Sequence, residues 1–500
     1  MNQLAAAPDA APGAAAAPAR TIFGQPRGLA TLFLTEMWER FTYYGMRGVL
    51  ILFMVAAVSK GGLGLDDRTA SSIYGMYIGG TYLFGLLGGW IADRLIGAQR
   101  AVAAGGVLII VGNLLLAVGN TPVIYLGLLV ITIGVGLLKP NASVMVASLY
   151  PEGGSRCDAG FSIFYMGINL GALIGPLLVG WFADEFGWRW GFTLPAIGMG
   201  LGLTQFLWTR HYLGNSGVAV EGERRGSWKG VLVLAGALAL AAALLMTGAL
   251  RVDAAVMAAA ASWAMVLLGV AYFGYLLFFA GLSRVERNRV WVMIALVAAG
   301  VTFWAGYEQT GASMNLFADR YTDRRILGWD MPTAWLQSIN PLFIIAFAPA
   351  FAALWIALGK RGRDLNAAAK FGAGLILLGL GFLVMYFAAL HVVAGEKVLW
   401  TWLTLAYLLH TFGELSLSPV GLSYMSKLAP PRFVGQVMGV WFLSMALGSN
   451  LAGQLSAQYD ASHLESLPAL FLRIFWYGVI GGAVMLLLTP FLRRMMAGVK

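Results

Sequence analysis

Charged residues and cysteine are both scarce in this chain of 500 residues. Charged side chains make up 11% of the sequence, whereas a typical soluble domain carries about a quarter. So few charges cannot cover a surface that faces water. The single cysteine, Cys157, excludes an internal disulfide and a cysteine-based zinc cluster. Nucleotide-binding loops, metal-ligand clusters and an appended soluble domain are missing too, which argues against a membrane enzyme.

Long apolar runs fill most of the chain, because 59% of its residues are hydrophobic. Many runs reach the roughly 20 residues that a helix needs to cross a bilayer. The sequence therefore predicts an all-α polytopic membrane protein. Polar and Gly/Pro-rich junctions divide it into fourteen spans, near residues 28–58, 69–95, 99–118, 122–149, 157–185, 189–213, 227–249, 254–281, 290–318, 333–358, 367–393, 397–428, 433–457 and 466–492.

The first 27 residues are an Ala/Pro tract, which we interpret as a disordered tail with no signal peptide. The seventh and eighth spans carry no charge in their interiors and are set aside as an inserted pair. We therefore predict one six-helix bundle over 28–213, a linker with two extra helices over 214–289, and a second six-helix bundle over 290–500.

The positive charges are distributed unevenly between alternate loops. Lys and Arg residues number 21 on the side that carries both termini and 8 on the other side. Cytoplasmic loops carry the excess of positive charge, so both termini are predicted to be cytoplasmic. This placement also explains the net charge of +10 without nucleic acid as a partner.

Charges inside spans are costly unless they are paired or line a wet cavity. With the inserted pair set aside, they fall on the first, fourth, seventh and tenth of twelve helices: Glu36, Glu39, Arg40, Arg47, Lys139, Glu308 and Glu414. Transporters built from inverted three-helix repeats place such helices around a central site. The alternative is that these charges only join helices as structural ion pairs.

The first span carries its charges on one face. At about 100° per residue, a set of six side chains falls within an arc of about 140°. Lipid would not tolerate that arc, so it is predicted to face the protein interior. The six residues are Glu36, Glu39, Arg40, Tyr43, Tyr44 and Arg47.

The segment 88–100, with Asp93 and Arg94, resembles the loop motif of the major facilitator superfamily, for which a gating role is expected. Four longer motifs follow one another along the chain: ExxERFxYYG from Glu36, FSIFYMGINLGAL from Phe161, FWAGYEQTGAS from Phe303 and GELSLSPVGLSYMSKLAP from Gly413. These four resemble motifs of the proton-dependent oligopeptide transporter family, which belongs to that superfamily. Ala172 stands where the family has Ser, and Tyr307 where Phe is usual. The inserted pair resembles the fourteen-helix bacterial members.

The resemblance implies a site that binds both ends of a short peptide. Arg47 and Lys139, with Arg40 nearby, would bind the peptide carboxylate, for which a planar guanidinium is well suited. Glu414, Asn169 and Asn340 would bind the amino end. The further substrate-binding residues implied are Tyr43, Tyr44, Tyr82, Trp304, Ser418 and Trp441. Any one aromatic is as easily explained by packing, and Asn169 by a bond between helices.

Proton coupling is expected from Glu36, Glu39, Arg40, Glu308 and Glu414. Arginine keeps its proton, so its glutamate partner must be the group that titrates. We predict that Glu308 pairs with Arg47 in the empty site and that protonation of Glu308 frees Arg47, with a similar exchange between Lys139 and Glu414. Which glutamate of the first span titrates is left open. His410, one turn before Glu414, is better explained by helix packing than by tuning that acid.

The sequence thus predicts a monomeric symporter in a bacterial inner membrane that imports di- and tripeptides with protons, has no enzymatic activity and needs no cofactor beyond the proton. The alternative is a proton-coupled major facilitator carrier for nitrate, an amino acid or a drug. Such a carrier would need the cationic site but not the cluster around Glu414.

Overall fold

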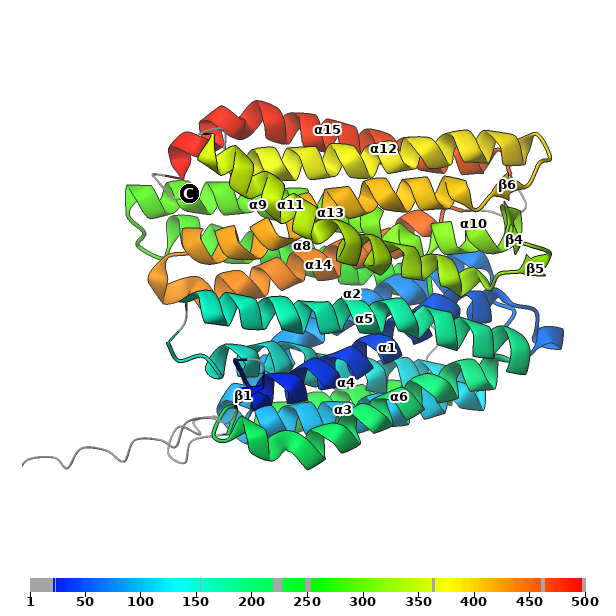
Figure 1. Cartoon of the computed structure of the whole chain (residues 1–500), viewed down its shortest axis with the longest axis horizontal. Helices are drawn as coiled ribbons and strands as arrows, with labels where there is room; N and C mark the ends of the chain where they lie inside the picture. Colours follow the sequence, from blue (N-terminus) through cyan, green and yellow to red (C-terminus); the bar gives the residue numbers. More distant parts are fainter. Residues whose placement is uncertain are drawn as a thin grey trace, which may run out of the picture.

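The computed structural model describes residues 21–22, 24–152, 154–218, 227–247, 253–361, 365–459 and 464–496. Its helices run roughly parallel to the long axis of the molecule (Figure 1). We call the end where α1 begins and α15 ends the terminal face, and the other end the distal face. Residues 1–20 of the tail predicted over 1–27 lie outside the described residues. Two short segments of its remaining residues pair as antiparallel strands, β1 (Thr21–Ile22) and β2 (Gln25–Pro26).

The first bundle holds the first six helices and forms the lower half of Figure 1. Its α6 continues into a 3-10 turn, η3 (Arg210–Leu213), and η1 (Val58–Lys60) is a similar turn after α1. The helices are α1 (Arg27–Val55), α2 (Asp67–Ile91), α3 (Ala98–Val118), α4 (Thr121–Ser148), α5 (Gly154–Phe186) and α6 (Trp188–Thr209).

The second bundle forms the upper half of Figure 1 and begins earlier than predicted, at Arg284 instead of residue 290. The single span predicted over 290–318 is one candidate span from Arg284 to Tyr321, but a 3-10 turn that was not predicted divides it into α9 and α10. The elements are α9 (Arg284–Tyr307), η4 (Glu308–Gly311), α10 (Ser313–Tyr321), η5 (Thr333–Ser338), α11 (Ile339–Lys360), α12 (Ala367–Val393), α13 (Thr401–Leu428), η6 (Pro431–Phe433), α14 (Val434–Ser456) and α15 (Ser466–Met495).

Two further helices, α7 (Trp228–Met246) and α8 (Ala254–Phe278), lie between the bundles in sequence, as the uncharged spans indicated. The α8 helix contacts α2 of one bundle and α14 of the other. Asn450 and Gln454 of α14 each donate a hydrogen bond to the Ser262 hydroxyl, at 2.9 and 2.7 Å. Polar contacts therefore attach α8 to the second bundle.

Short strands connect loops at the distal face. β3 (Thr322–Asp323) pairs in parallel with β6 (Val398–Leu399), and β4 (Arg325–Ile326) forms a hairpin with β5 (Trp329–Asp330). The two residues between β4 and β5 both have positive φ, 52° at Leu327 and 87° at Gly328. Positive φ at both central positions is what a tight hairpin turn of this kind requires.

Small residues let helices of the two bundles approach closely. A Cβ added to Gly75 of α2 would lie 2.7 Å from the Cα of Gly453 in α14. Close backbone approach through glycine is a usual way for membrane helices to pack, because lipid supplies no hydrophobic force between them. Ser71 and Ser456 hydroxyls lie 3.0 Å apart one turn further on. The α2–α14 crossing is thus one main contact between the halves.

Hydropathy alone identifies fewer spans than the fold contains. Nine helices of the described residues are long and apolar enough to cross a membrane by length and composition. The α1 helix is not among them, because Glu36, Glu39, Arg40 and Arg47 interrupt its apolar sequence. The α1 helix packs against α5 and α6 of the first bundle (Figure 1), so its charges lie inside the protein.

Candidate substrate cavity

The charged face of α1 is buried, as helical geometry predicted. Arg40 is 3% exposed, and Glu36 and Glu39 are each 1% exposed. The Arg40 guanidinium lies 2.7 Å from a Glu36 oxygen and 3.1 Å from a Glu39 oxygen. Two carboxylates therefore share one guanidinium. Apart from this ion pair, the Glu39 oxygens have no hydrogen-bond partner among the described residues.

Arg47 lies two turns further along α1 and joins the two bundles. Its Nη2 lies 2.6 Å from a carboxylate oxygen of Glu308, which confirms the predicted pairing. Its Nε donates to the Tyr74 hydroxyl at 2.6 Å, and Nη2 also donates to the Thr310 hydroxyl at 3.3 Å. Arg47 and Glu308 are 4% and 1% exposed. Breaking one side of such a buried pair is costly, because it leaves the other charge unpaired.

Glu308 lies where the helix between α9 and α10 is interrupted. Regular helix ends at Tyr307, and the next four residues form η4. Gly311 closes this turn against the cluster: a Cβ there would lie 1.8 Å from the Tyr74 hydroxyl oxygen and 2.9 Å from Arg47 Nε. Broken helices at midplane sites are a recurring feature of secondary transporters. The break brings the Glu308 carboxylate to Arg47.

A second polar cluster belongs mainly to the second bundle. Asn340 at the start of α11 donates to Glu414 at 3.1 Å and to Thr411 at 2.9 Å, both on α13. The Tyr307 hydroxyl donates to the Asn340 carbonyl oxygen at 3.0 Å. The departure from the family pattern at Tyr307 thus adds a hydrogen bond that phenylalanine cannot make. Asn340 is thereby fixed in orientation beside an acid.

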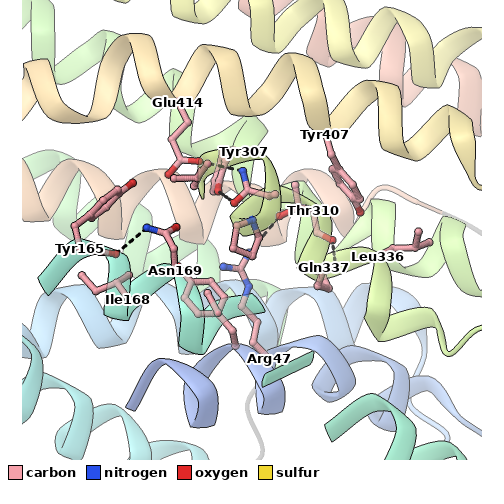
Figure 2. Close-up of a pocket in the computed structure, with 15 residues that line it drawn as sticks. Arg47, Tyr165, Ile168, Asn169, Tyr307, Thr310, Leu336, Gln337, Tyr407 and Glu414 are labelled. Carbon is pink, nitrogen blue, oxygen red and sulfur yellow. Dashed lines mark hydrogen bonds between the residues drawn. The ribbon is translucent and has the colours of Figure 1, made fainter. Parts of the chain in front are cut away.

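Between the two clusters lies a cavity of about 650 Å³. In Figure 2, Arg47 rises into it from α1, Asn169 enters from α5, and Glu414 descends from α13. Tyr44, Arg47, Asn169, Asn340 and Glu414 are the predicted binding residues that line it. The cavity therefore has a cation from the first bundle at one end and a carboxylate from the second bundle at the other.

Other predicted site residues lie elsewhere. Lys139 and Tyr82 contact each other, with the Lys139 ammonium 4.3 Å from the centre of the Tyr82 ring. Lys139 pairs with no carboxylate in the described part of the chain, so the expected Lys139–Glu414 pair is not formed in this state. Arg40, Tyr43 and Ser418 also lie outside the cavity wall as the structure defines it.

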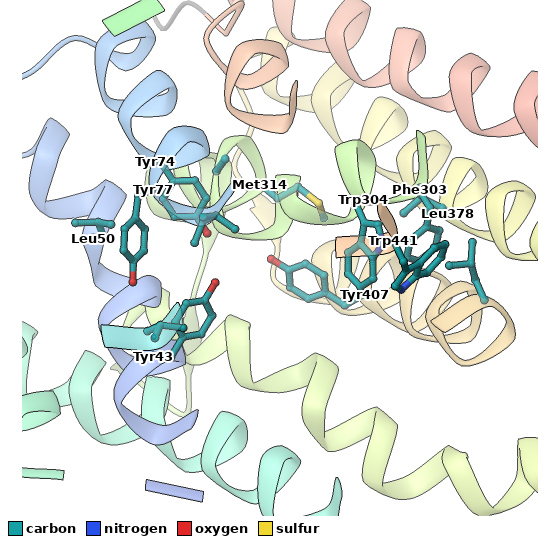
Figure 3. Packing of buried hydrophobic residues seen from close by; sticks show 14 of the residues in the cluster. Tyr43, Leu50, Tyr74, Tyr77, Phe303, Trp304, Met314, Leu378, Tyr407 and Trp441 are labelled. Carbon is teal, nitrogen blue, oxygen red and sulfur yellow. The ribbon is translucent and has the colours of Figure 1, made fainter. Parts of the chain in front are cut away.

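Two tryptophans expected to line the cavity are packed in the core of the second bundle instead. Trp441 is 3% exposed and lies 6.1 Å from the Phe371 ring, and Trp304 packs edge-on against Phe303. Figure 3 shows both tryptophans in this cluster, with Tyr43 in a separate aromatic group beside α1 and α2. Trp304 and Trp441 are therefore not among the residues that line the cavity, because aromatic content alone does not separate core from cavity.

Several cavity residues were not predicted: Tyr165, Ile168, Ala172, Thr310, Leu336, Gln337, Pro341, Ile344 and Tyr407, with Tyr307 noted only as a departure from the family. Helical spacing could have found some of them. Tyr165 lies one turn before Asn169, and Tyr407 lies two turns before Glu414 on the same face. Thr310 and Gln337 belong to 3-10 turns, where that spacing does not apply.

His410 and the loop motif also have defined positions. His410 is 1% exposed, packs 4.8 Å from the Phe382 ring and fits against Gly381, which supports helix packing as its role. Asp93 and Arg94 are exposed in η2 (Ala92–Ile96), a wide helical turn that ends at Gly97 with φ 84°. Their expected role in gating stays a prediction.

The two bundles are joined on the distal side of the cavity. Arg320 of α10 forms two hydrogen bonds of 2.7 Å with Asp67 at the start of α2. Trp335 Nε1 donates to the Leu177 carbonyl at 2.8 Å, and the Ser338 hydroxyl donates to the Leu173 carbonyl at 2.7 Å. These contacts between η5 and α5 close the distal end of the cavity.

On the terminal side the same helices present open surfaces. Along α5, Tyr165 is 42% exposed and Phe161 is 37% exposed, on the face that carries Asn169. Along α13, Leu422 is 44% exposed two turns beyond Glu414. The contacts between η5 and α5 thus lie on the distal side of the cavity, whereas these side chains of α5 and α13 are exposed on the terminal side.

Comparison with known proteins identifies the family. Residues 99–470 match the family model PTR2, described as the POT family. The chain belongs to the POT family. It is 42% identical over 492 residues to the peptide transporter YePEPT of Yersinia enterocolitica, covering 95% of this chain and 96% of that one. It is 33% identical over 501 residues to a di-/tripeptide transporter of Lactococcus lactis, covering 96% and 98%.

Solved structures agree with this membership. A crystal structure of the peptide transporter POT in complex with sulfate superposes with a TM-score of 0.89 at 40% identity, covering 96% of this chain and 98% of that one. The major facilitator fold predicted from the sequence is thereby confirmed. The protein is a multi-pass membrane protein of a family of bacterial peptide transporters.

Proposed function

We propose that this POT family member is a symporter that imports di- and tripeptides together with protons by alternating access. The observation that carries the proposal is the cavity between the bundles, with Arg47 at one end and Glu414 at the other. All peptides share a carboxylate and an amino group at their ends and differ in their side chains. A site with fixed charges at both ends therefore suits a whole class of peptides.

The peptide carboxylate binds at Arg47, and the amino group binds at Glu414 with Asn340 and Asn169. A guanidinium forms paired hydrogen bonds with a carboxylate, which gives both strength and orientation. The relatives named as di-/tripeptide transporters support this substrate class. Lys139, held over Tyr82 in this state, adds positive charge near the carboxylate end when the cavity closes.

The ion pair between Arg47 and Glu308 couples the proton to the peptide. Arg47 keeps its charge at all physiological pH values, so the pair is broken by protonation of Glu308. A neutral Glu308 no longer holds Arg47, whose guanidinium is then free for the substrate carboxylate. Peptide and proton thus bind together. A corresponding exchange between Lys139 and Glu414, and a proton shared by Glu36 and Glu39 beside Arg40, complete the coupling.

Both termini lie in the cytoplasm in this proposal, which rests on the excess of Lys and Arg in the loops of that side. The structure then corresponds to a state open to the cytoplasm. To bind peptide from outside, the contacts between Asp67 and Arg320 must open while the terminal side closes. Each chain holds a complete cavity, so we propose that the monomer is the transporting unit, without enzymatic activity or a cofactor other than the proton.

An alternative is a carrier for nitrate, an amino acid or a drug. Arg47 would serve an anion equally well, but the hydrogen-bonded group of Tyr307, Asn340 and Glu414 would have no ligand in nitrate. An amino acid carries both charged groups, at a shorter separation. The length of the substrate therefore distinguishes a peptide from an amino acid, whereas the charges at its two ends do not.

Uptake into proteoliposomes tests the function. A labelled dipeptide should accumulate only with an inward proton gradient, and di- and tripeptides should compete for uptake while single amino acids and nitrate should not. Accumulation that ignores the gradient would refute proton coupling. Equal competition by free amino acids would refute peptides as the substrate class.

A further inference from the structure

A second hollow lies between α8, α9 and α14 and shares no lining residue with the substrate cavity. It has a volume of about 1190 Å³. We call it the lateral groove, and residues that line it include Gly269, Phe273, Gly274, Trp291, Val297 and Leu443. Apart from Ser444, its side chains carry no hydroxyl, amide or charged group. The groove therefore suits a hydrocarbon occupant.

The groove arises from how α8 is attached. The first two turns of α8 are held to α14 by hydrogen bonds from Asn450 to the Ala258 carbonyl at 2.7 Å and to Ser262 at 2.9 Å. Beyond Met265, which still packs on Leu443, glycines replace side chains on the inner face. A Cβ on Gly269 would meet only Leu443, at 4.0 Å, and one on Gly274 would meet nothing within 4 Å. The space between the helices is therefore unfilled.

The terminal end of the groove is marked by an aromatic ring and positive charge. Trp291 of α9 lines the groove and is 48% exposed. Tryptophan is enriched at the boundary between hydrocarbon and headgroups. Arg287 and Arg284 precede Trp291 by one and two helical turns on the same face of α9, within about 40° of it at 100° per residue. They therefore lie at headgroup depth, directly beyond the hydrocarbon-lined space.

Both arginines are exposed, and neither has an ion-pair partner within the part of the chain that the structure describes. The neighbouring Arg432 is occupied, because its guanidinium donates to the Ala280 carbonyl and brackets the turn between α8 and α9. An apolar groove that ends at two free guanidinium groups matches a phospholipid, with its chain in the groove and its phosphate at the arginines.

We propose that the lateral groove binds one acyl chain of an anionic phospholipid whose phosphate is held by Arg284 and Arg287. The lipid fills the space that the glycines of α8 leave, between the hydrogen bonds of Asn450 at one end of α8 and that of Arg432 at the other. Guanidinium groups bind phosphate through paired hydrogen bonds. A zwitterionic headgroup also has a phosphate, but its positive charge opposes binding to the arginines. This site does not depend on the transported substrate.

Native mass spectrometry of the full chain in detergent tests the proposal. Phosphatidylglycerol and phosphatidylcholine with identical acyl chains are added, and the lipid retained per protein is compared. A preference of about tenfold for phosphatidylglycerol is expected, because its headgroup carries no positive charge that opposes the two exposed arginines. Replacing both groups, Arg284→Gln with Arg287→Gln, should abolish the preference. Arg493→Gln with Arg494→Gln, two exposed arginines at the end of α15, should leave it intact.

Binding of the lipid's acyl chain in the groove is tested separately. Gly269→Leu places a side chain in the groove from a position whose Cβ has room, and it should lower retention of both lipids. Gly236→Leu, at an exposed position of α7 with nothing within 4 Å of an added Cβ, should not. Gly274→Leu replaces the first variant if that one fails to fold. The proposal is overturned if the two leucine variants retain lipid equally, if the control arginine pair matters as much as Arg284 and Arg287, or if glycerol phosphate displaces the lipid completely.

Discussion

The carboxylate of Glu308 lies 2.6 Å from the guanidinium of Arg47, and this contact joins a helix of the first bundle to the broken helix of the second. Both side chains are almost fully buried. Arg47 of this pair lines the cavity that also holds Glu414. In the proposed mechanism the state of the pair links substrate binding to the relative position of the two halves.

Replacement of Glu308 by glutamine should separate exchange from coupling. Glutamine keeps the size of the side chain and imitates the protonated acid, so Arg47 stays free for substrate. We expect the Glu308→Gln variant to exchange labelled for unlabelled peptide across liposomes while losing uptake driven by a proton gradient. Glu152→Gln, at an exposed surface pair with Arg156, is the matched control and should behave like the parent. Normal gradient-driven uptake by Glu308→Gln would remove this residue from the coupling mechanism.

Lysine at position 47 should weaken recognition of the peptide carboxylate. It preserves the positive charge but loses the planar fork that also bonds Tyr74 and Thr310. Loss of a charge-assisted hydrogen bond costs about 1.5 kcal/mol or more, so KM should rise roughly tenfold. The discriminating measurement is competition by a dipeptide and by its C-terminal amide. The parent should prefer the free acid, and Arg47→Lys should discriminate less; an unchanged preference would place carboxylate binding elsewhere.

Removal of the Tyr307 hydroxyl should affect the amino end of the substrate. In Tyr307→Phe the ring still stacks on Phe303 at 5.7 Å, but Asn340 loses the donor that fixes its carbonyl oxygen. A neutral hydrogen bond contributes about 1 kcal/mol, so KM should rise about fivefold. The parent and variant are compared with a dipeptide and its N-acetyl derivative. If acetylation is penalised equally in both proteins, Tyr307 does not position the amino-end site.

The ion pair between Asp67 and Arg320 should hold the distal side closed. A thiol at Ser338, which is 4% exposed on that side, reports opening in a Cys157→Ser background. Arg320→Gln should raise the rate of maleimide labelling of Ser338→Cys several-fold, because the partly exposed ion pair contributes about 1 kcal/mol to the closed arrangement. The exchange Asp67→Arg with Arg320→Asp should return the rate towards that of the parent. Fast labelling in the exchanged protein would show that charge pairing does not close this side.

A methyl group at Gly311 should disturb the Arg47 cluster without changing any charge. The added Cβ would lie 1.8 Å from the Tyr74 hydroxyl oxygen, so a neighbour has to move. Overpacking of this kind costs about 1–3 kcal/mol, and Gly311→Ala should lower both the midpoint of thermal unfolding and transport. Gly359→Ala, in a helix with nothing within 4 Å, is the control and should be neutral or slightly stabilising. Equal unfolding midpoints would contradict the tight packing described at η4.

The main features of the fold could be predicted from the sequence because a bilayer leaves few alternatives. Apolar length and loop charge give the spans, and the cost of charge in lipid requires the face of α1 that carries Glu36 to Arg47 to lie inside. The predicted partner of Arg47 was correct for the same reason, since a buried arginine needs an acid and Glu308 was at equivalent depth. The exact start of α9 and the break at Glu308 were missed, because hydropathy does not report a 3-10 turn in an apolar segment.

Sequence by itself thus determined that this is a helical membrane protein of the POT family with a polar interior and acids next to arginines. Tertiary structure decided which groups share the cavity. It brings Tyr165, Gln337 and Tyr407 to the wall, buries Trp304 and Trp441 in the core, and leaves Lys139 against Tyr82 instead of Glu414. The physical reason is that a helix face fixes only the direction of a side chain. What it meets depends on how two bundles pack across their interface.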